Sequence, residues 1–131
     1  MKSFRALVFS ALALAGCAAA TQPIDTVGLA EASMNLDQEH VGLLLADISE
    51  IFPAGFTKDA AASITSQVDG LWVGQSGNWE FSVTFNGERA RLVIAAYKDD
   101  LDAPDLYFFS SPEVAAQISE RLVAFSEAHG I

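Results

Sequence analysis

Hydrophobic side chains recur every three or four residues in three stretches of the chain. This spacing predicts a helix over Leu36–Ile51 with Asn35 as its N-cap, and a C-terminal helix that starts after Ser111 and ends at Gly130. The stretch Lys58–Val68 also fits a helical stripe, although the residues at its end resemble a hairpin turn. We favour a helix at this position.

A strict alternation of apolar and polar residues follows, which is the pattern of a half-buried strand. It runs from Trp79 to Phe85 and stops at Asn86-Gly87, the pair preferred in two-residue type I′ hairpin turns. Such a turn places apolar pairs on one face of the hairpin and polar pairs on the other. The predicted pairs are Val83 with Ala90, Phe81 with Leu92, Trp79 with Ile94, Thr84 with Arg89 and Ser82 with Arg91.

Two further strands are predicted on either side of this hairpin, at Leu71–Ser76 and Leu106–Ser110. The order of the elements predicts an α+β fold. We expect a four-stranded antiparallel meander, with the flanking N-terminal helices and the C-terminal helix packed on one face. Trp72 and Trp79 are expected to lie in the core.

The composition indicates a single folded domain. The chain has 131 residues, of which 51% are hydrophobic and 18% charged, and it is therefore too apolar for an intrinsically disordered protein. Its 17 Asp and Glu residues against 7 Lys and Arg give a formal net charge of -10. Nucleic acid is not an expected partner, because Lys and Arg supply most of the affinity for phosphates.

The N-terminus has the pattern of an export signal. Lys2 and Arg5 precede an apolar run over Ala6–Ala15, which is shorter than the roughly 20 residues of a transmembrane helix. Removal of this signal also removes the two cations, so the remaining chain is more acidic still.

The apolar run ends in Leu14-Ala15-Gly16-Cys17, which resembles the lipobox of bacterial lipoproteins at all four positions. The resemblance implies diacylglycerol on the Cys17 thiol, cleavage after Gly16 and acylation of the new N-terminus. Ala18 in the next position implies sorting to the outer membrane. The alternative is an ordinary secreted protein that is cut after Ala20.

The lipobox divides the chain into a signal peptide (1–16), a lipidated tether (17–28) and a single α+β domain (29–131). An anchor with more than one acyl chain makes attachment to the bilayer effectively stable. Cys17 is the only cysteine, so no internal disulfide is expected. We expect the domain to face the periplasm from the outer membrane.

Few groups suited to catalysis are present. The two histidines, His40 and His129, fall at the ends of predicted helices. Paired carboxylates at a usable spacing, a metal triad and a phosphate-binding loop are all missing from the sequence pattern. We therefore expect no enzymatic activity and no cofactor.

Four aspartates between the last two predicted strands are weak candidates for a metal site: Asp99, Asp100, Asp102 and Asp105. Several carboxylates in one loop could surround Ca²⁺, which prefers oxygen ligands. Their spacing matches no calcium loop, because apolar residues and a proline interrupt the series. A solvated acidic turn is the favoured interpretation.

The second face of the predicted sheet is the candidate binding surface. If the helices cover only the other face, this surface is open, and its mixed composition is typical of protein interfaces. Its expected centre consists of Arg89, Arg91, Val93 and Tyr97. The alternative is that one of the first two helices covers it.

These features predict a lipid-anchored cell-envelope protein that acts without catalysis, as a binding or assembly accessory for an envelope protein. One alternative is an acidic inhibitor or sequestering module for a cationic envelope protein, because strong negative charge steers a basic partner. Another is a domain that binds a small ligand or Ca²⁺.

Overall fold

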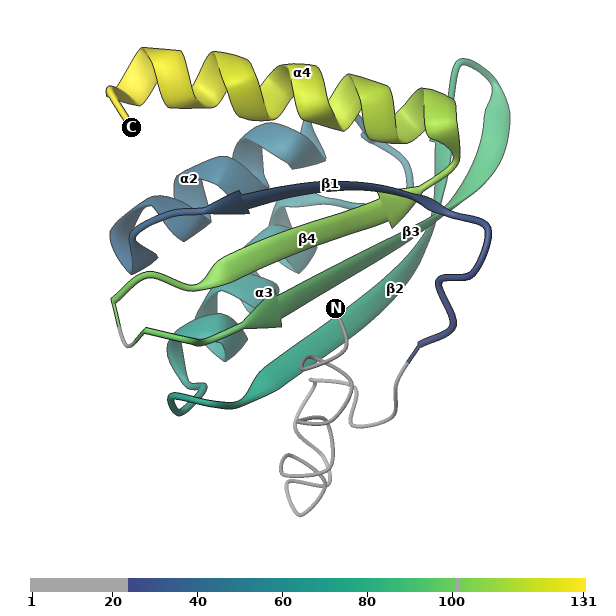
Figure 1. Ribbon diagram of the computed structural model, residues 1–131. Coiled ribbons are helices and arrows are strands. Elements are labelled where there is room, and N and C mark those ends of the chain that lie inside the picture. Colours follow the sequence, from purple (N-terminus) through teal and green to yellow (C-terminus); the bar gives the residue numbers. More distant parts are fainter. Residues whose placement is uncertain (1–23, 101) are drawn as a thin grey trace.

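The computed structural model describes residues 24–100 and 102–131 (Figure 1). These form β1 (Ala30–Asn35), α2 (Gln38–Ser49), α3 (Lys58–Asp69), β2 (Ser76–Phe85), β3 (Glu88–Tyr97), β4 (Asp105–Ser110) and α4 (Pro112–His129). The predicted α+β fold with a four-stranded antiparallel sheet is confirmed. The lipobox and Cys17 lie outside the described residues.

β2 and β3 form the predicted hairpin. Asn86 and Gly87 both have positive φ, at 53° and 81°, as a type I′ turn requires. All of the predicted cross-strand pairs are confirmed: Val83 with Ala90, Phe81 with Leu92, Trp79 with Ile94, Thr84 with Arg89 and Ser82 with Arg91.

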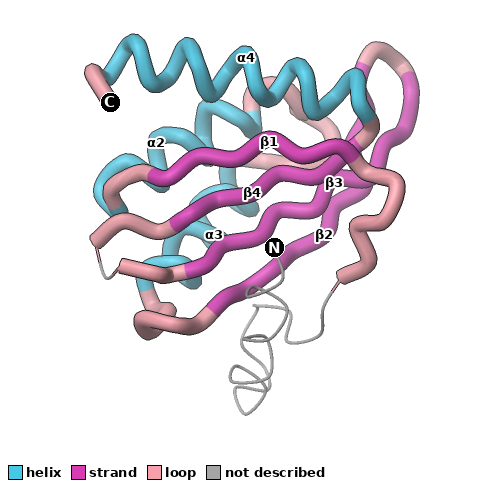
Figure 2. Tube along the Cα trace, in the orientation of Figure 1, coloured by secondary structure: helices cyan, strands magenta, loops and turns pink. Residues whose placement is uncertain are grey.

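The strand order in the sheet is β1-β4-β3-β2, with each neighbouring pair antiparallel (Figure 2). β1 pairs with β4 along its whole length, from Ala30 opposite Ser110 to Asn35 opposite Asp105. The two edges of the sheet are therefore β1 and β2, which are separated in the chain by α2 and α3.

The strand predicted at Leu71–Ser76 is wrong, since only Ser76 belongs to a strand, and β1 takes its place in the sheet. The hydrophobic pattern does not reveal β1, because its six residues alternate only weakly. β1 forms because the free edge of β4 supplies hydrogen-bond partners for the backbone of β1. A buried backbone group without a partner would be costly.

α2 starts two residues later than predicted, with Asp37 as its N-cap. Asn35 is instead the last residue of β1, and its side-chain Nδ2 donates to Ala103 O at 2.9 Å and to Asp105 Oδ1 at 2.7 Å. This amide therefore links the end of β1 to the start of β4 rather than capping a helix.

α3 and α4 confirm the other two predicted helices. Thr57 caps α3, where its Oγ1 accepts a hydrogen bond from Ala60 N at 3.2 Å. α4 begins with Pro112 after Ser111 and ends at Gly130, which adopts the left-handed conformation with φ 69°. Within the described part of the chain, no helix has the length and apolar character needed to cross a bilayer.

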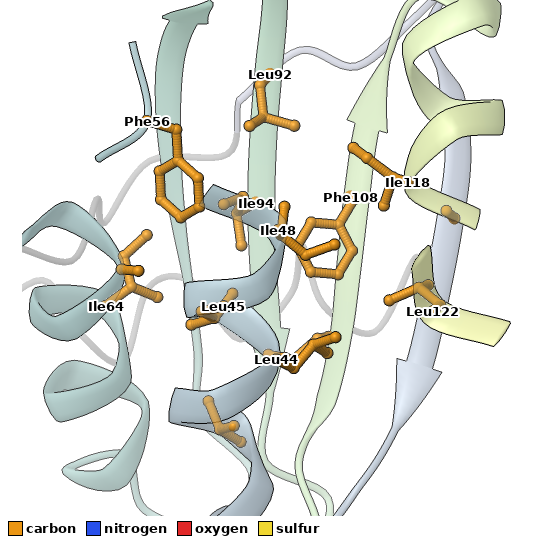
Figure 3. Close-up of a cluster of buried hydrophobic side chains, with 14 of the residues drawn as sticks. Leu44, Leu45, Ile48, Phe56, Ile64, Leu92, Ile94, Phe108, Ile118 and Leu122 are labelled. Carbon is orange, nitrogen blue, oxygen red and sulfur yellow. The ribbon is translucent and has the colours of Figure 1, made fainter. Parts of the chain in front are cut away.

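The core lies between one face of the sheet and the helices. α2 and α3 lie across that face, and α4 runs along its β1 edge (Figure 1). The buried side chains that meet there include Leu44, Leu45, Ile48, Ile64, Leu92, Ile94, Phe108, Ile118 and Leu122 (Figure 3). Burial of each such side chain stabilises the fold by about 1.5–3 kcal/mol.

The two tryptophans have opposite environments. Trp79 is 7% exposed, and its Nε1 donates to Gln67 Oε1 at 2.9 Å. Trp72 is 76% exposed, so the prediction that it lies in the core is wrong. Because β2 begins only at Ser76, Trp72 does not continue the inward-facing row of the hairpin.

We call the face of the sheet opposite the helices the outer face. Val93, Ala95 and Phe109 are buried together at its centre, where Ile24 and Leu29 pack against them. The prediction of an open face is therefore wrong at the centre. The residues that precede β1 contribute to this cover, rather than either of the first two helices.

Candidate functional site

The four residues predicted as the centre of a docking surface do not form one surface. Val93 is only 1% exposed. Arg89 is exposed beside the hairpin turn, whereas Tyr97 is half-buried at the other end of β3, opposite Ser76. The exposed members are thus separated by the filled centre of the outer face.

Arg91 is already paired within the sheet. Its Nε donates to Glu80 Oε2 at 2.5 Å, and its Nη2 donates to Glu80 Oε1 at 3.4 Å. The hydrogen bond to Glu80 raises the pKa of Arg91 against the opposing effect of burial, and the charges of Glu80 and Asp25 raise it further. Because Glu80 neutralises the charge of Arg91, Arg91 would attract an acidic partner only weakly.

Two acidic segments meet instead at one end of the sheet. The β1–β4 register places Asn35 beside Asp105, and the chain beyond this pair leads into α2 on one side and into the β3–β4 loop on the other. Gln38 N, in the first turn of α2, donates to Asp102 O in that loop at 2.7 Å. The start of α2 is thereby tied to the loop.

The junction contains an open recess of about 530 Å³ lined by Asp37, Gln38, Glu39 and Asp102, which we call the acidic recess. Its three carboxylate residues are exposed. None of the three forms an ion pair with another residue of the described chain. Carboxylates from two segments far apart in the sequence therefore surround the same volume of solvent.

The aspartates of the β3–β4 loop do not converge on one point. Asp105 Oδ1 accepts a hydrogen bond from Asn35, and Asp100 Oδ1 accepts one from Asp102 N at 3.0 Å. Asp99 and Asp100 are exposed, and Asp102 alone of the four lines the acidic recess. The loop therefore contributes one carboxylate to the recess rather than a complete set of ligands.

The other two carboxylates of the recess, those of Asp37 and Glu39, are not apparent as site residues in the sequence. In the sequence they look like the ordinary acidic first turn of a helix, where negative charge favours the helix dipole. Only the pairing of β1 with β4 brings them to Asp102, and that pairing has no local signal.

A histidine lies beside the recess. One potential ligand atom from each of Asp37, Glu39 and His40 lies within 4.8 Å of the others. The Nδ1 of His40 is buried and has no hydrogen-bond partner among the described residues. The His40 ring meets the ring of His129 edge-on at 5.7 Å, and His129 stacks on Phe125 at 4.0 Å.

The described chain offers the acidic recess little exposed positive charge. All 17 Asp and Glu residues lie in the described part of the chain, whereas two of the 7 basic residues, Lys2 and Arg5, lie outside it. Of the five basic residues in the described part, three are in ion pairs, and the side chain of Lys98 is 1% exposed. The pairs are Lys58 with Glu50, Arg91 with Glu80 and Arg121 with Asp47.

Chemically, the arrangement is suited to attracting and holding positive charge. Exposed carboxylates that form no ion pair create a negative potential that reaches about one Debye length, roughly 8 Å at physiological salt. Comparison with protein-family models, with curated proteins and with solved structures finds no match to this chain.

Proposed function

We propose that this protein is a lipid-anchored cell-envelope lipoprotein whose domain acts without catalysis, by binding a cationic protein at the acidic recess. The resemblance to a lipobox at Cys17 supports the anchor. Among the hypotheses drawn from the sequence, the inhibitor or sequestering module for a cationic partner is favoured. The docking hypothesis needs the outer face, which is filled at Val93 and Phe109.

A single observation carries the choice of partner. Asp37 and Glu39 at the start of α2 and Asp102 in the β3–β4 loop line one recess without an ion pair in the described chain. Like charges repel when they are gathered, and although the helix dipole favours Asp37 and Glu39 at the start of α2, it does not account for Asp102 beside them. A ligand that supplies Lys or Arg side chains relieves the repulsion.

The expected affinity contribution is modest for each residue. An exposed ion pair contributes about 0.2–1 kcal/mol, so three carboxylates contribute about 0.6–3 kcal/mol together. This range corresponds to a factor of about 3 to about 140 in the dissociation constant. Because the recess is open to solvent, the contribution decreases as salt is added.

A charge-matched pair of variants tests the proposal. The first carries Asp37→Asn, Glu39→Gln and Asp102→Asn. The control neutralises three carboxylates on α4 and has the same net charge: Glu113→Gln, Glu120→Gln and Glu127→Gln. Binding of a fluorescent oligolysine peptide is measured by anisotropy at low and at physiological salt.

We expect the recess variant to bind the peptide about tenfold more weakly than wild type at low salt. The control is expected to change by less than about twofold, because its charges lie on another helix. Equal losses in both variants would show that net charge alone governs binding. Asn is also a good N-cap residue, so Asp37→Asn leaves the start of α2 intact.

The anchor is tested separately. Intact mass of the purified protein reports whether the chain begins at an acylated Cys17, and fractionation reports whether Cys17→Ser releases the protein from the membrane. An unmodified chain that begins after Ala20 would contradict the anchor and leave the acidic recess unaffected.

A second candidate function is the binding of a divalent cation by Asp37, Glu39 and His40. It is favoured by the spacing of their potential ligand atoms, within 4.8 Å, and by the unpartnered Nδ1 of His40. Carboxylate oxygen and imidazole nitrogen together suit Zn²⁺. Titration calorimetry with ZnCl₂ on wild type and on His40→Gln tests this second function. A binding heat in wild type that is lost in His40→Gln would support it, and the same heat in both proteins would exclude His40 as a ligand.

A further inference from the structure

An exposed apolar pair lies in the connection between α3 and β2. Trp72 is 76% exposed and Val73 is 57% exposed. They are adjacent in the sequence, so their side chains present apolar surface to solvent at one place. Tryptophan combines a large apolar ring with a polar N–H, and this combination is enriched at membrane–water interfaces.

A hydrogen-bonded turn fixes the position of this exposed pair. Gln75 N donates to Trp72 O at 2.9 Å, and Trp72 N donates to Gln75 Oε1 at 2.8 Å. Gly74 has φ 91°, the conformation that a type II turn requires at its third residue. We call residues 72–75 the Trp72 turn.

The Trp72 turn is also fastened to the rest of the domain through Lys98. Gly74 N donates to Lys98 O at 2.7 Å, and Lys98 N donates to Gln75 O at 2.9 Å. The buried Lys98 side chain donates from Nζ to Asp69 O at 3.1 Å, at the end of α3. Lys98 therefore joins the turn to the end of α3, and the turn presents Trp72 in a defined position.

The chain around the Trp72 turn is almost free of charge. Asp69 is the only charged residue from Ala60 to Trp79, although 18% of the whole chain is charged. The exposed neighbours include Ser66 and Gly70. Exposed carboxylates lie close to the turn at Asp69 and, beside Lys98, at Asp99 and Asp100, so the apolar contact with a lipid surface is confined to Trp72 and Val73.

The position of the Trp72 turn in the fold agrees with such a contact. It lies at the start of β2, the sheet edge opposite β1 and α4 (Figure 1). The acidic recess lies at the same end of the strands but at the opposite edge, where β1 ends and α2 begins. A bilayer at the Trp72 turn would leave the β1 edge and α4 away from the membrane.

The tether is short enough to keep the domain at the membrane. Six residues lie between Cys17 and Ile24, the first described residue, so the seven steps from one to the other span at most about 25 Å when fully extended. A domain of about 100 residues has a radius of gyration of about 13 Å. The lipid would thus hold the Trp72 turn at high effective concentration near the bilayer, where even a weak contact forms.

We propose that the Trp72 turn is a second, non-covalent contact with the bilayer, in which Trp72 and Val73 insert at the membrane interface. This inference rests on the proposed lipid anchor. It gives the domain one orientation, with the β2 edge toward the lipid and the acidic recess open to cationic proteins.

The test uses the full-length protein, purified after processing and reconstituted in vesicles of phosphatidylcholine and phosphatidylethanolamine. Matched vesicles contain brominated phosphatidylcholine, which quenches tryptophan at short range. Trp72→Phe isolates the signal of Trp72, because Trp79 is buried and remains in both proteins. Val73→Asp places a charge in the contact, and Val123→Asp on α4 is its control, since Val123 is equally exposed at 56%.

Flotation with the vesicles shows whether the anchor is present. We expect brominated lipid to quench the Trp72 part of the floating wild-type emission, taken as the difference from Trp72→Phe, by about twofold, with emission at shorter wavelength than in detergent-free buffer. Trp72→Phe should lose this quenching, Val73→Asp should reduce it, and Val123→Asp should keep it.

Flotation without quenching of Trp72 would overturn the inference and leave the anchor standing, with the Trp72 turn then available to a protein partner. A protein that does not float would overturn the anchor and the inference together. Equal quenching in Val73→Asp and wild type would overturn the insertion of Val73.

Discussion

Asn78 offers a direct test of how the outer face is packed. Its side chain is 0% exposed and lies on β2 opposite Ala95. Neither its Oδ1 nor its Nδ2 has a hydrogen-bond partner among the described residues. Leucine has the same branching at Cγ, so Asn78→Leu keeps the approximate shape and removes both unpaired polar atoms.

The expected effect follows from the cost of burying polar groups. A buried donor or acceptor without a partner costs about 1–3 kcal/mol, and asparagine is a poor strand former. We therefore expect Asn78→Leu to raise the free energy of unfolding by about 1–3 kcal/mol. Few substitutions in a natural protein stabilise it by so much.

Urea denaturation, followed by circular dichroism, measures the change. With a slope of about 2 kcal/mol per molar urea, the middle of the usual range, the midpoint should rise by about 0.5–1.5 M with an unchanged slope. A fall in the midpoint would refute the reasoning, because it would show that the amide forms favourable hydrogen bonds.

Asn78→Asp is the matched control. Burial would raise the pKa of the introduced carboxyl above its unfolded value, so the folded state binds the proton more tightly than the unfolded state does. The penalty, about 2 kcal/mol or more, should be present at neutral pH and should shrink as the pH falls and the carboxyl is protonated. A variant with the same stability across this range would show that position 78 is accessible to water.

Three further predictions concern the fold. Gly55→Ala should lower the free energy of unfolding by about 2 kcal/mol or more in urea, because Gly55 has φ 114° and an added Cβ would lie 2.4 Å from the Ser82 carbonyl oxygen. Arg121→Ala removes the 2.8 Å bond to Asp47 that joins α4 to α2, and since both side chains are 31% exposed the loss should be about 1 kcal/mol and smaller at high salt. Burial lowers the pKa of Lys98 in the folded state below its ordinary 10.5. Between the folded-state pKa and 10.5 the unfolded state binds more protons, so the free energy of unfolding should rise with pH over that range. Lys98→Met should abolish this rise.

The elements that are specified by their own residues could be predicted. Asn86-Gly87 sets the hairpin turn, and the alternation before it sets every cross-strand pair of β2 and β3. The ends of α4 follow from Pro112 and Gly130, whose backbone preferences act within a few residues. In each case the decisive interaction is local, so tertiary contacts reinforce the local preference.

The errors concern residues whose environment depends on distant segments. Asn35 has the side chain of a helix cap, but its amide finds Asp105 once β1 pairs with β4. Trp72 has the hydrophobicity of a core residue, but the turn that ends in Gln75 directs it to solvent. Val93 was expected on an open surface and is buried beside Ile24 and Leu29.

The α+β class, the hairpin register and the strong negative charge follow from the sequence alone, because they depend on composition and short-range periodicity. The place where that charge gathers depends on long-range strand pairing. Asp37 follows β1 and Asp102 precedes β4, and these two strands are far apart in the chain. The backbone hydrogen bonds between β1 and β4 bring the two aspartates together. No local pattern encodes that meeting, since Asn35 at the end of β1 and Asp105 at the start of β4 are 70 residues apart in the chain.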